Sequence, residues 1–345
     1  MNNNWMIYGA NGYSGELIAR KAIENGLQPT IAGRNEQAIM ALAKQLNLSF
    51  KVFDLDDVDK ISENLSDMDL VLHCAGPFSQ TSAPMIQACL KSKTHYLDIT
   101  GEVSVFEHAK SLDNKANKNG IVVCPGVGFD VIPTDCLASQ LKELMPDATH
   151  LTLGFDSRSG LSAGTAKTSV EGLGNGGKVR KDGKLQKVPL AFKTRKIDFG
   201  NGEKLAMTIP WGDISTAYTS TGIPNIEVYI PSSPKLVKTL RRLNWIRFLL
   251  KTKFVQNILK KKAGKVKGPS NEQRELLKTY LWGEVQNAKG EIKQLRMVTD
   301  NGYKLTVNGS LKMVEYTLNS NKSGYFTPSQ LAHNRVIEEV SESNS

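Results

Sequence analysis

The sequence predicts an α/β protein, in which a Rossmann-type doubly wound parallel sheet is joined to a second α+β domain with a mainly antiparallel sheet. Three observations predict it. A glycine-rich turn, GANGYSG, follows the first apolar run; strand-like and helix-like segments then alternate up to residue 126; and beyond residue 144 apolar residues recur at every second position. A chain of 345 residues is long enough for two domains. We expect them at 1–130 and 131–326.

The composition is that of a globular protein, with 40% hydrophobic and 23% charged residues and no apolar run long enough to span a bilayer. The first residues, MNNNW, lack the features of a secretory signal, so we expect a cytoplasmic location. The four cysteines are 15, 35 and 12 positions apart, without a C-x-x-C pair. This spacing argues against a metal site or a disulfide framework and favours reduced, buried thiols.

The glycine-rich turn lies between a predicted strand and a predicted helix. Trp5–Tyr8 suits a buried strand, and Leu17, Ile18 and Ala22 recur at helical spacing. Glycines in such a turn let the backbone approach a pyrophosphate, to which the helix N-terminus presents N–H groups. The alternative is a turn with a purely structural role. The predicted phosphate-binding residues are Gly9, Asn11, Gly12, Tyr13, Ser14 and Gly15.

The end of the second predicted strand indicates which dinucleotide binds. Residues 30–32 read as a strand, followed by Gly33, Arg34 and Asn35. An acidic residue here would bind the ribose 2′-hydroxyl, whereas an arginine accommodates a 2′-phosphate. Arg34 therefore favours NADP(H), unless it is an exposed arginine on a solvated turn.

The alternation continues with predicted strands at 50–54, 69–78, 94–99 and 121–126 and helices at 58–65, 84–90 and 103–116. Ligands of such sheets lie beyond the carboxyl ends of the strands. We therefore expect Cys74, Ala75, Gly76 and Pro77 to line the cofactor site.

Three carboxylates follow later strand ends, at Asp98, Glu102 and Asp130. A carboxyl kept protonated by burial could donate a proton beside a nicotinamide, so these are the candidate catalytic residues. Each has an alternative role as a helix cap or loop anchor. None of the nine tyrosines has a lysine four positions later, which argues against the short-chain dehydrogenase mechanism.

These segments resemble the saccharopine dehydrogenase-like oxidoreductases, in particular the group that includes trans-acting enoyl reductases. The resemblance extends over nearly the whole chain and is carried by GANGYSG, AGRN, HCAGPF, YLDITGE, PGVGFDVIPTD, GTAKTSVEG, IPWGDISTAYTSTGIPNIEVY, KGPSNEQR and WGEV. It implies an NADP(H) cofactor and a C-terminal helix, residues 327–340, that packs back on the nucleotide domain.

Beyond a predicted helix at 133–144, the second half alternates as strands do. DNGY at 300–303 predicts a hairpin between QLRMVT and KLTVNG. Thr327-Pro-Ser-Gln330 fits a capping box, so a final helix should run to about Val340. The glycine-rich stretch 159–183 is either a mobile loop over the active site or an anion cradle.

Lys167, Trp211 and Asp213 are the candidates for lining a substrate cleft. Their alternative roles are a solvated lysine, a core indole and a turn aspartate.

One segment, 235–267, carries twelve Lys or Arg and no Asp or Glu, interleaved with apolar residues. Three interpretations remain open. Residues 235–262 could lie on an anionic membrane surface, or cover a pocket or a second subunit in a homodimer, or bind nucleic acid, for which no specific motif is present.

Taken together, the sequence predicts an NADP(H)-dependent oxidoreductase that acts on a hydrophobic or acyl-type substrate, an enoyl or a carbonyl compound. Two alternatives are a saccharopine-type reductase acting on amino and keto acids, and a non-catalytic NADP-binding sensor or membrane-recruited adaptor.

Overall fold

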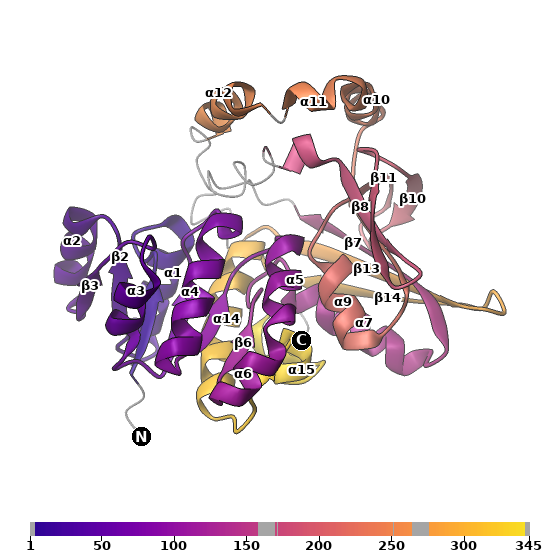
Figure 1. Cartoon of the computed structure of the whole chain (residues 1–345). Coiled ribbons are helices and arrows are strands. Elements are labelled where there is room, and N and C mark those ends of the chain that lie inside the picture. Colours follow the sequence, from indigo (N-terminus) through magenta and orange to yellow (C-terminus); the bar gives the residue numbers. More distant parts are fainter. Residues whose placement is uncertain (1–3, 158–169, 171, 251, 264–275, 342–345) are drawn as a thin grey trace. The chain divides into compact units, whose positions relative to one another are not determined.

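We describe the protein from a computed structural model, which describes residues 4–157, 170, 172–250, 252–263 and 276–341. Contacts divide the chain into two units (Figure 1). The first comprises Met1–Ile132 and Tyr303–Val340, and the second Pro133–Gly302 and Ser341–Ser345. Residues 303–326, which the sequence places in the second domain, are therefore part of the first unit.

The first unit is built on a parallel sheet with the order β3-β2-β1-β4-β5-β6-β15. The order 3-2-1-4-5-6 is that of the doubly wound dinucleotide-binding fold, which confirms the predicted fold class. The strands are β1 (Trp5–Tyr8), β2 (Thr30–Gly33), β3 (Phe50–Val52), β4 (Leu70–His73), β5 (His95–Asp98), β6 (Val122–Cys124) and β15 (Gly324–Tyr325). Because all strands are parallel, their carboxyl ends share one edge, and the order reverses between β1 and β4.

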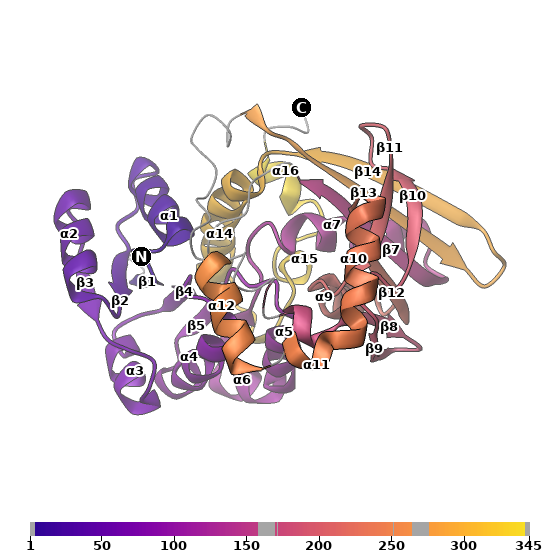
Figure 2. The same ribbon diagram turned by 90° about the horizontal axis from the view of Figure 1, so that it is seen from above.

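Helices cover both faces of this sheet, with α1 and α4 on opposite sides of the strands (Figure 2). Met6, Val71 and Tyr96, which point to one face, form a core with residues of α3, α4, α5 and α6. The helices of the unit are α1 (Tyr13–Glu24), α2 (Glu36–Leu46), α3 (Val58–Leu65), α4 (Phe78–Ser92), α5 (Val103–Ser111), α6 (Asp113–Asn119), α14 (Gly302–Leu318), α15 (Pro328–Leu331) and α16 (Val336–Val340).

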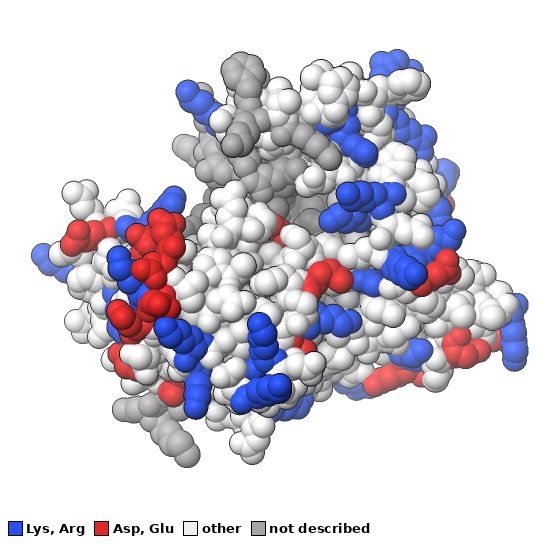
Figure 3. Space-filling model, viewed as in Figure 1, with Lys and Arg blue, Asp and Glu red and all other residues white. Residues whose placement is uncertain are grey.

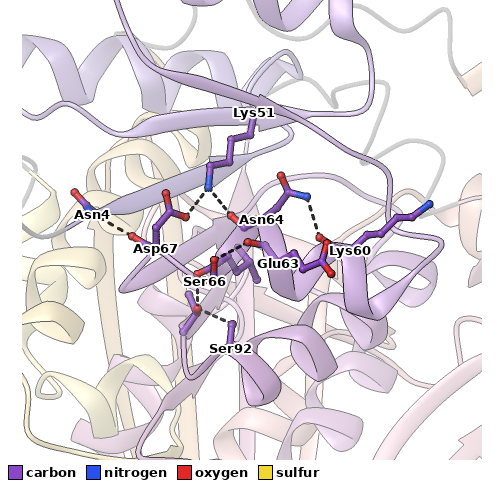
Figure 4. A network of polar contacts seen from close by, with 10 residues as sticks. Asn4, Lys51, Lys60, Glu63, Asn64, Ser66, Asp67 and Ser92 are labelled. Carbon is purple, nitrogen blue, oxygen red and sulfur yellow. Dashed lines mark hydrogen bonds and ion pairs between the residues drawn. The ribbon is translucent and has the colours of Figure 1, made fainter.

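A polar network fixes the edge of the sheet opposite to these carboxyl ends (Figure 4). The Lys51 ammonium donates to the Asn64 carbonyl at 2.8 Å and pairs with Asp67 at 2.5 Å. The Asn4 amide donates to the Asp67 carbonyl, and the Ser66 hydroxyl closes the end of α3 on the Glu63 carbonyl. These contacts hold the C-terminal end of α3 beside the start of β1, so this edge has a structural role.

Two helices of the first unit differ from their predictions. The helix predicted to begin at Pro84 begins at Phe78, with Pro84 in its interior. It starts earlier because Pro77 is its N-cap and the Glu102 carboxylate accepts its first N–H groups. The helix predicted at 103–116 is interrupted at Leu112, giving α5 and α6.

The prediction of a hairpin at 300–303 is wrong. β14 ends at Thr299, and KLTVNG lies in α14. That segment is helical because Leu305, Met313 and Val314 are buried at helical spacing within the first unit. Taken alone, the hexapeptide KLTVNG fits the alternating pattern of a strand equally well.

The prediction of one final helix is also wrong, because residues 327–340 form two short helices, α15 and α16. The predicted capping box at its start is present, with the Thr327 N–H donating to the Gln330 side chain at 3.2 Å. Both helices belong to the first unit.

The second unit has a mixed sheet with the order β10-β11-β12-β7-β13-β14, to which the hairpin β8-β9 is joined through β12. Among the described residues, the strands of this sheet pair antiparallel except β12 and β7, which are parallel. The strands are β7 (Ala148–Ser157), β8 (Gly177–Lys181), β9 (Lys184–Val188), β10 (Thr194–Asp198), β11 (Glu203–Ile209), β12 (Asn225–Pro231), β13 (Thr279–Asn287) and β14 (Ile292–Thr299).

Helices pack on this sheet at several points. Leu137 and Leu141 of α7 (Ile132–Leu144) lie against Gly283 of β13, where a Cβ would be 2.5 Å from a methyl of Leu141. The other helical elements are α9 (Asp213–Thr221), α10 (Pro234–Leu243), η1 (Asn244–Ile246), α11 (Arg247–Leu250) and α12 (Lys253–Ala263). In the described part of the chain, every helix is too short or too polar to cross a bilayer.

Candidate functional site

The loop between β1 and α1 can exist only with glycines at its ends. At Gly9, where φ is +83°, a Cβ would lie 2.8 Å from the Ala75 backbone nitrogen. At Gly15 it would lie 2.4 Å from the Gly9 carbonyl oxygen. Gly12 is exposed and is the N-cap of α1, so no side chain caps the first turn of this twelve-residue helix. The result is a backbone cradle at a positive helix end, which is the feature that binds a pyrophosphate.

Neighbouring strand ends hold this loop in place. The Gly9 N–H donates to the Ala32 carbonyl at 2.7 Å, and the Cys74 N–H donates to the Tyr8 carbonyl at 2.8 Å. The Asn11 side chain reaches the end of β2, where its oxygen is 3.0 Å from the position of a Cβ on Gly33. The structure therefore brings together the predicted segments 9–15, 33–35 and 74–77 within one unit.

Arg34 and Asn35 follow β2 as predicted. Arg34 is exposed, whereas the Asn35 side chain caps α2 by accepting the Ala38 N–H at 3.1 Å. Arg34 lies close enough to the Tyr8 hydroxyl to oppose the rise of its pKa, which burial and Asp54 bring to about 12. The arginine is thus open to an anion at the ribose end, and Asn35 has a structural role.

The segment 74–77 connects β4 to α4. The Thr81 hydroxyl donates to the Ala75 carbonyl at 2.7 Å and lies 3.2 Å from that of Pro77. Burial raises the pKa of the Cys74 thiol, so it stays protonated. Cys89, Cys124 and Cys136 are buried, as expected.

Asp98, the first candidate acid, is an anchor. Its carboxylate is fully buried and accepts the Tyr96 hydroxyl at 2.6 Å and the N–H groups of Thr100 and Gly126, both at 2.9 Å. Burial raises its pKa to about 6 against the opposing effect of these donors. Its three hydrogen bonds tie the loop after β5 to the loop after β6.

Glu102, the second candidate, caps a helix. One carboxylate oxygen accepts the Phe78 N–H at 2.9 Å and the other the Ser79 N–H at 3.1 Å. A carboxylate at a helix N-terminus is favoured by the helix dipole. This side chain therefore positions α4 and the loop before it.

Asp130 differs from the other two. Its side chain is partly buried and lies against Gly101, where a Cβ would be 2.6 Å from a carboxylate oxygen. Desolvation raises its pKa to about 7. A carboxyl with this pKa can exchange a proton near neutral pH.

The predicted cleft residues lie in the second unit. Trp211 packs on Phe155 with ring centroids 5.1 Å apart. Asp213 is fully buried in the first turn of α9 and accepts the Thr134 hydroxyl at 2.6 Å. These contacts fit the structural alternatives. Lys167 lies outside the described residues, as do all of residues 159–169 and residue 171 of the glycine-rich stretch 159–183.

Sequence reasoning missed the contribution of α14. Tyr303 at its start packs edge-on against Tyr13, with ring centroids 5.0 Å apart. The Thr306 hydroxyl accepts the Phe129 N–H at 3.0 Å beside Asp130. No local signal marked these residues, because the pattern at 300–303 indicated a turn between strands.

His73 was also missed. It ends β4, is fully buried, and its Nε2 lies 3.0 Å from the Thr81 hydroxyl. Burial lowers its pKa to about 3, so the ring is neutral. Its ring packs against those of Tyr8, at the end of β1, and Phe78, at the start of α4.

The fold and this cradle define a dinucleotide-binding protein of two units. Residues 5–124 match the family described as the saccharopine dehydrogenase NADP binding domain. Comparison with known proteins confirms the resemblance seen in the sequence: the first unit carries a saccharopine dehydrogenase NADP binding domain, and the chain is similar to proteins named saccharopine dehydrogenase-like oxidoreductases.

Similar proteins include one from Arabidopsis thaliana named a probable mitochondrial saccharopine dehydrogenase-like oxidoreductase, 26% identical over 51% of this chain and 44% of the relative. A trans-acting enoyl reductase of Mycobacterium ulcerans is 27% identical over 49% of this chain and 44% of the relative. The chain thus aligns with less than half the length of either. The apo saccharopine dehydrogenase (L-Glu forming) of Saccharomyces cerevisiae has a TM-score of 0.64 at 12% identity, over 98% of this chain and 96% of its own, which shows a shared fold.

Proposed function

We propose that the protein is an NADPH-dependent oxidoreductase that reduces a hydrophobic or acyl-type substrate, an enoyl or a carbonyl compound. The observation that carries the proposal is the cradle at residues 9–15, in which added Cβ atoms at Gly9 and Gly15 would collide with backbone. When bound, NADPH supplies the hydride. The protein itself must bind and orient the cofactor, exclude water and deliver a proton.

An apolar substrate is supported by the partners of the cationic side chains in the second unit. Arg195 forms a bidentate pair with Glu284, at 3.0 and 3.2 Å, and Lys204 pairs with Asp156. These cations already have carboxylate partners, so they do not favour saccharopine-type substrates with several carboxylates. One relative is named a trans-acting enoyl reductase, which agrees with an acyl substrate.

The experiment that tests the proposal measures NADPH oxidation with medium- and long-chain enoyl and carbonyl thioesters, and separately with a keto acid plus an amino acid. Turnover of the thioesters supports the proposal. Turnover of only the acid pair supports the saccharopine-type alternative, and NADPH binding without turnover of any substrate supports a sensor. The expected cytoplasmic location is part of the proposal and is tested by fractionation.

Arg34 sets the predicted cofactor preference. We expect Arg34→Ala to weaken NADPH binding by about tenfold or more, because a charge-assisted contact with the 2′-phosphate is lost, and to leave NADH binding unchanged. Calorimetry with both cofactors measures this. Arg335→Ala, another exposed arginine of the first unit, is the control and should change neither affinity. Equal effects of Arg34→Ala on the two cofactors would contradict the assignment.

Asp130 is the proposed proton donor. Since its pKa is raised to about 7, the protonated form is lost as the pH rises through 7, and wild-type turnover should fall over the same range. We expect Asp130→Asn to lower kcat by about 100-fold and to remove this pH dependence, with NADPH affinity unchanged. A variant profile that keeps the inflexion near pH 7 would assign the proton to another group.

A further inference from the structure

A basic amphipathic segment, residues 234–263, consists of α10, η1, α11 and α12, of which α10 lies beside the strands of the second unit (Figure 1). One side of α10 is docked on the sheet. Val237 is buried and forms an apolar cluster with Ala191 and Met207, which Leu240 joins. The segment therefore has an inner side that is already occupied.

Hydrogen bonds fix the orientation of this segment. The Asn244 side chain accepts the Leu190 N–H at 2.8 Å and donates to the Leu190 carbonyl at 3.2 Å. The Arg241 guanidinium donates to the Ala191 carbonyl at 3.2 Å. These bonds hold α10 and η1 in a fixed orientation on residues 190–191.

The outer side is apolar and open. Trp245 is 86% exposed, Phe248 68% and Leu249 44%. These three residues follow one another at helical spacing across η1 and α11, so they form one projecting ridge. Exposed apolar side chains elsewhere on the segment are Leu236, Ile246 and Ile258. Large apolar groups held away from the core in this way mark a contact surface.

Cations surround the ridge. No acidic residue occurs between Lys235 and Lys267, and in Figure 3 blue side chains appear without red ones where Figure 1 draws α10. A groove of about 410 Å³ beside α10 is lined by apolar residues, among them Leu205, Val237 and Trp245, and by the cations Lys238, Arg241 and Arg242. A groove lined by apolar and cationic residues is complementary to a lipid with an anionic headgroup.

We propose that this surface binds an anionic lipid bilayer, with Trp245 and Phe248 inserted at the headgroup level and the lysines and arginines above the phosphates. Lysine is depleted in protein–protein interfaces, whereas a cationic helix with Trp, Phe and Leu is typical of interfacial helices. Nucleic-acid binding by base stacking would use the aromatic rings of Trp245 and Phe248 but would not need the aliphatic side chain of Leu249. The inference is independent of the proposed redox function.

Vesicle co-sedimentation without NADPH tests it, with phosphatidylcholine alone and with about 30 mol% phosphatidylserine added. We expect binding to the anionic vesicles, weakened by salt, and a loss of about tenfold or more in the partition coefficient for Trp245→Ser/Phe248→Ser. The matched control is Phe50→Ser/Leu276→Ser, which replaces exposed apolar residues, 43% and 69% exposed, away from the segment. It should bind as the wild type does.

Tryptophan fluorescence gives a second readout. Trp5 and Trp282 are buried and Trp211 is half-buried, so a blue shift on adding anionic vesicles reports Trp245 and should vanish in Trp245→Phe. Absence of vesicle binding, or equal binding by both double variants, would overturn the proposal. The proposal would also be overturned if light scattering showed a dimer that Trp245→Ser/Phe248→Ser abolishes and the control variant does not. Binding of nucleic acid without binding of vesicles would overturn it too.

Discussion

Replacing Gly9 with alanine is expected to lower the free energy of unfolding by about 3 kcal/mol or more and to abolish NADPH binding. The φ angle of +83° is unfavourable for alanine, and the new Cβ would lie within 3.0 Å of three atoms of Ala75. The Ala75 backbone cannot retreat easily, because the preceding residue bonds to the Tyr8 carbonyl at 2.8 Å. Urea denaturation and calorimetry with NADPH measure the two effects.

Gly26→Ala is the matched control for this prediction. Its φ of +75° imposes a similar backbone strain, but no atom lies within 4 Å of the position of its Cβ. We expect a loss of about 1 kcal/mol and unchanged NADPH binding. Equal losses for the two variants would show that backbone strain alone, and not the close approach at Ala75, requires a glycine at residue 9.

Removing the Asp98 carboxylate is expected to cost about 3 kcal/mol or more, because Asp98→Ala leaves the Tyr96 hydroxyl and two backbone N–H groups without their acceptor. Asp59→Ala is the control, since it removes an exposed carboxylate that pairs with Lys91, and it should lower the free energy of unfolding by less than about 1 kcal/mol. Chemical denaturation measures both. A loss for Asp98→Ala as small as that of the control would refute its role as an anchor.

The pH dependence of this effect has a definite sign. Burial raises the pKa of Asp98 to about 6, above the value of about 3.9 in an unfolded chain. The folded state therefore binds the extra proton between pH 4 and 6, and the stability of the wild type relative to Asp98→Asn should fall as the pH rises through this window. A difference between the two that grows with pH would contradict the raised pKa.

Much of the first unit was predictable because its signals are local. Glycines at residues 9, 12 and 15, apolar residues at helical spacing and the predicted boundaries of α3 depend on short stretches of chain. The ribose-end position of Arg34 follows from its place directly after β2. The family resemblance came from the same kind of short motif.

The errors occur where distant residues decide the local structure. KLTVNG alternates like a strand, but α14 is helical because the first unit buries Leu305 and Met313. Pro84 looks like a helix start, yet Glu102, eighteen positions later, caps a turn that begins at Phe78. Neither partner can be identified from the segment itself.

The sequence by itself determined the alternation of strands and helices and the glycine cradle, because each depends on backbone geometry within a few residues. Only the tertiary structure decided which contacts each carboxylate makes at the carboxyl ends of the strands. Asp98 and Glu102 bind backbone N–H groups that the fold brings to them, and Asp130, which lies against Gly101, has a raised pKa. A carboxylate's role is set by which donors surround it, and those donors come from other parts of the chain.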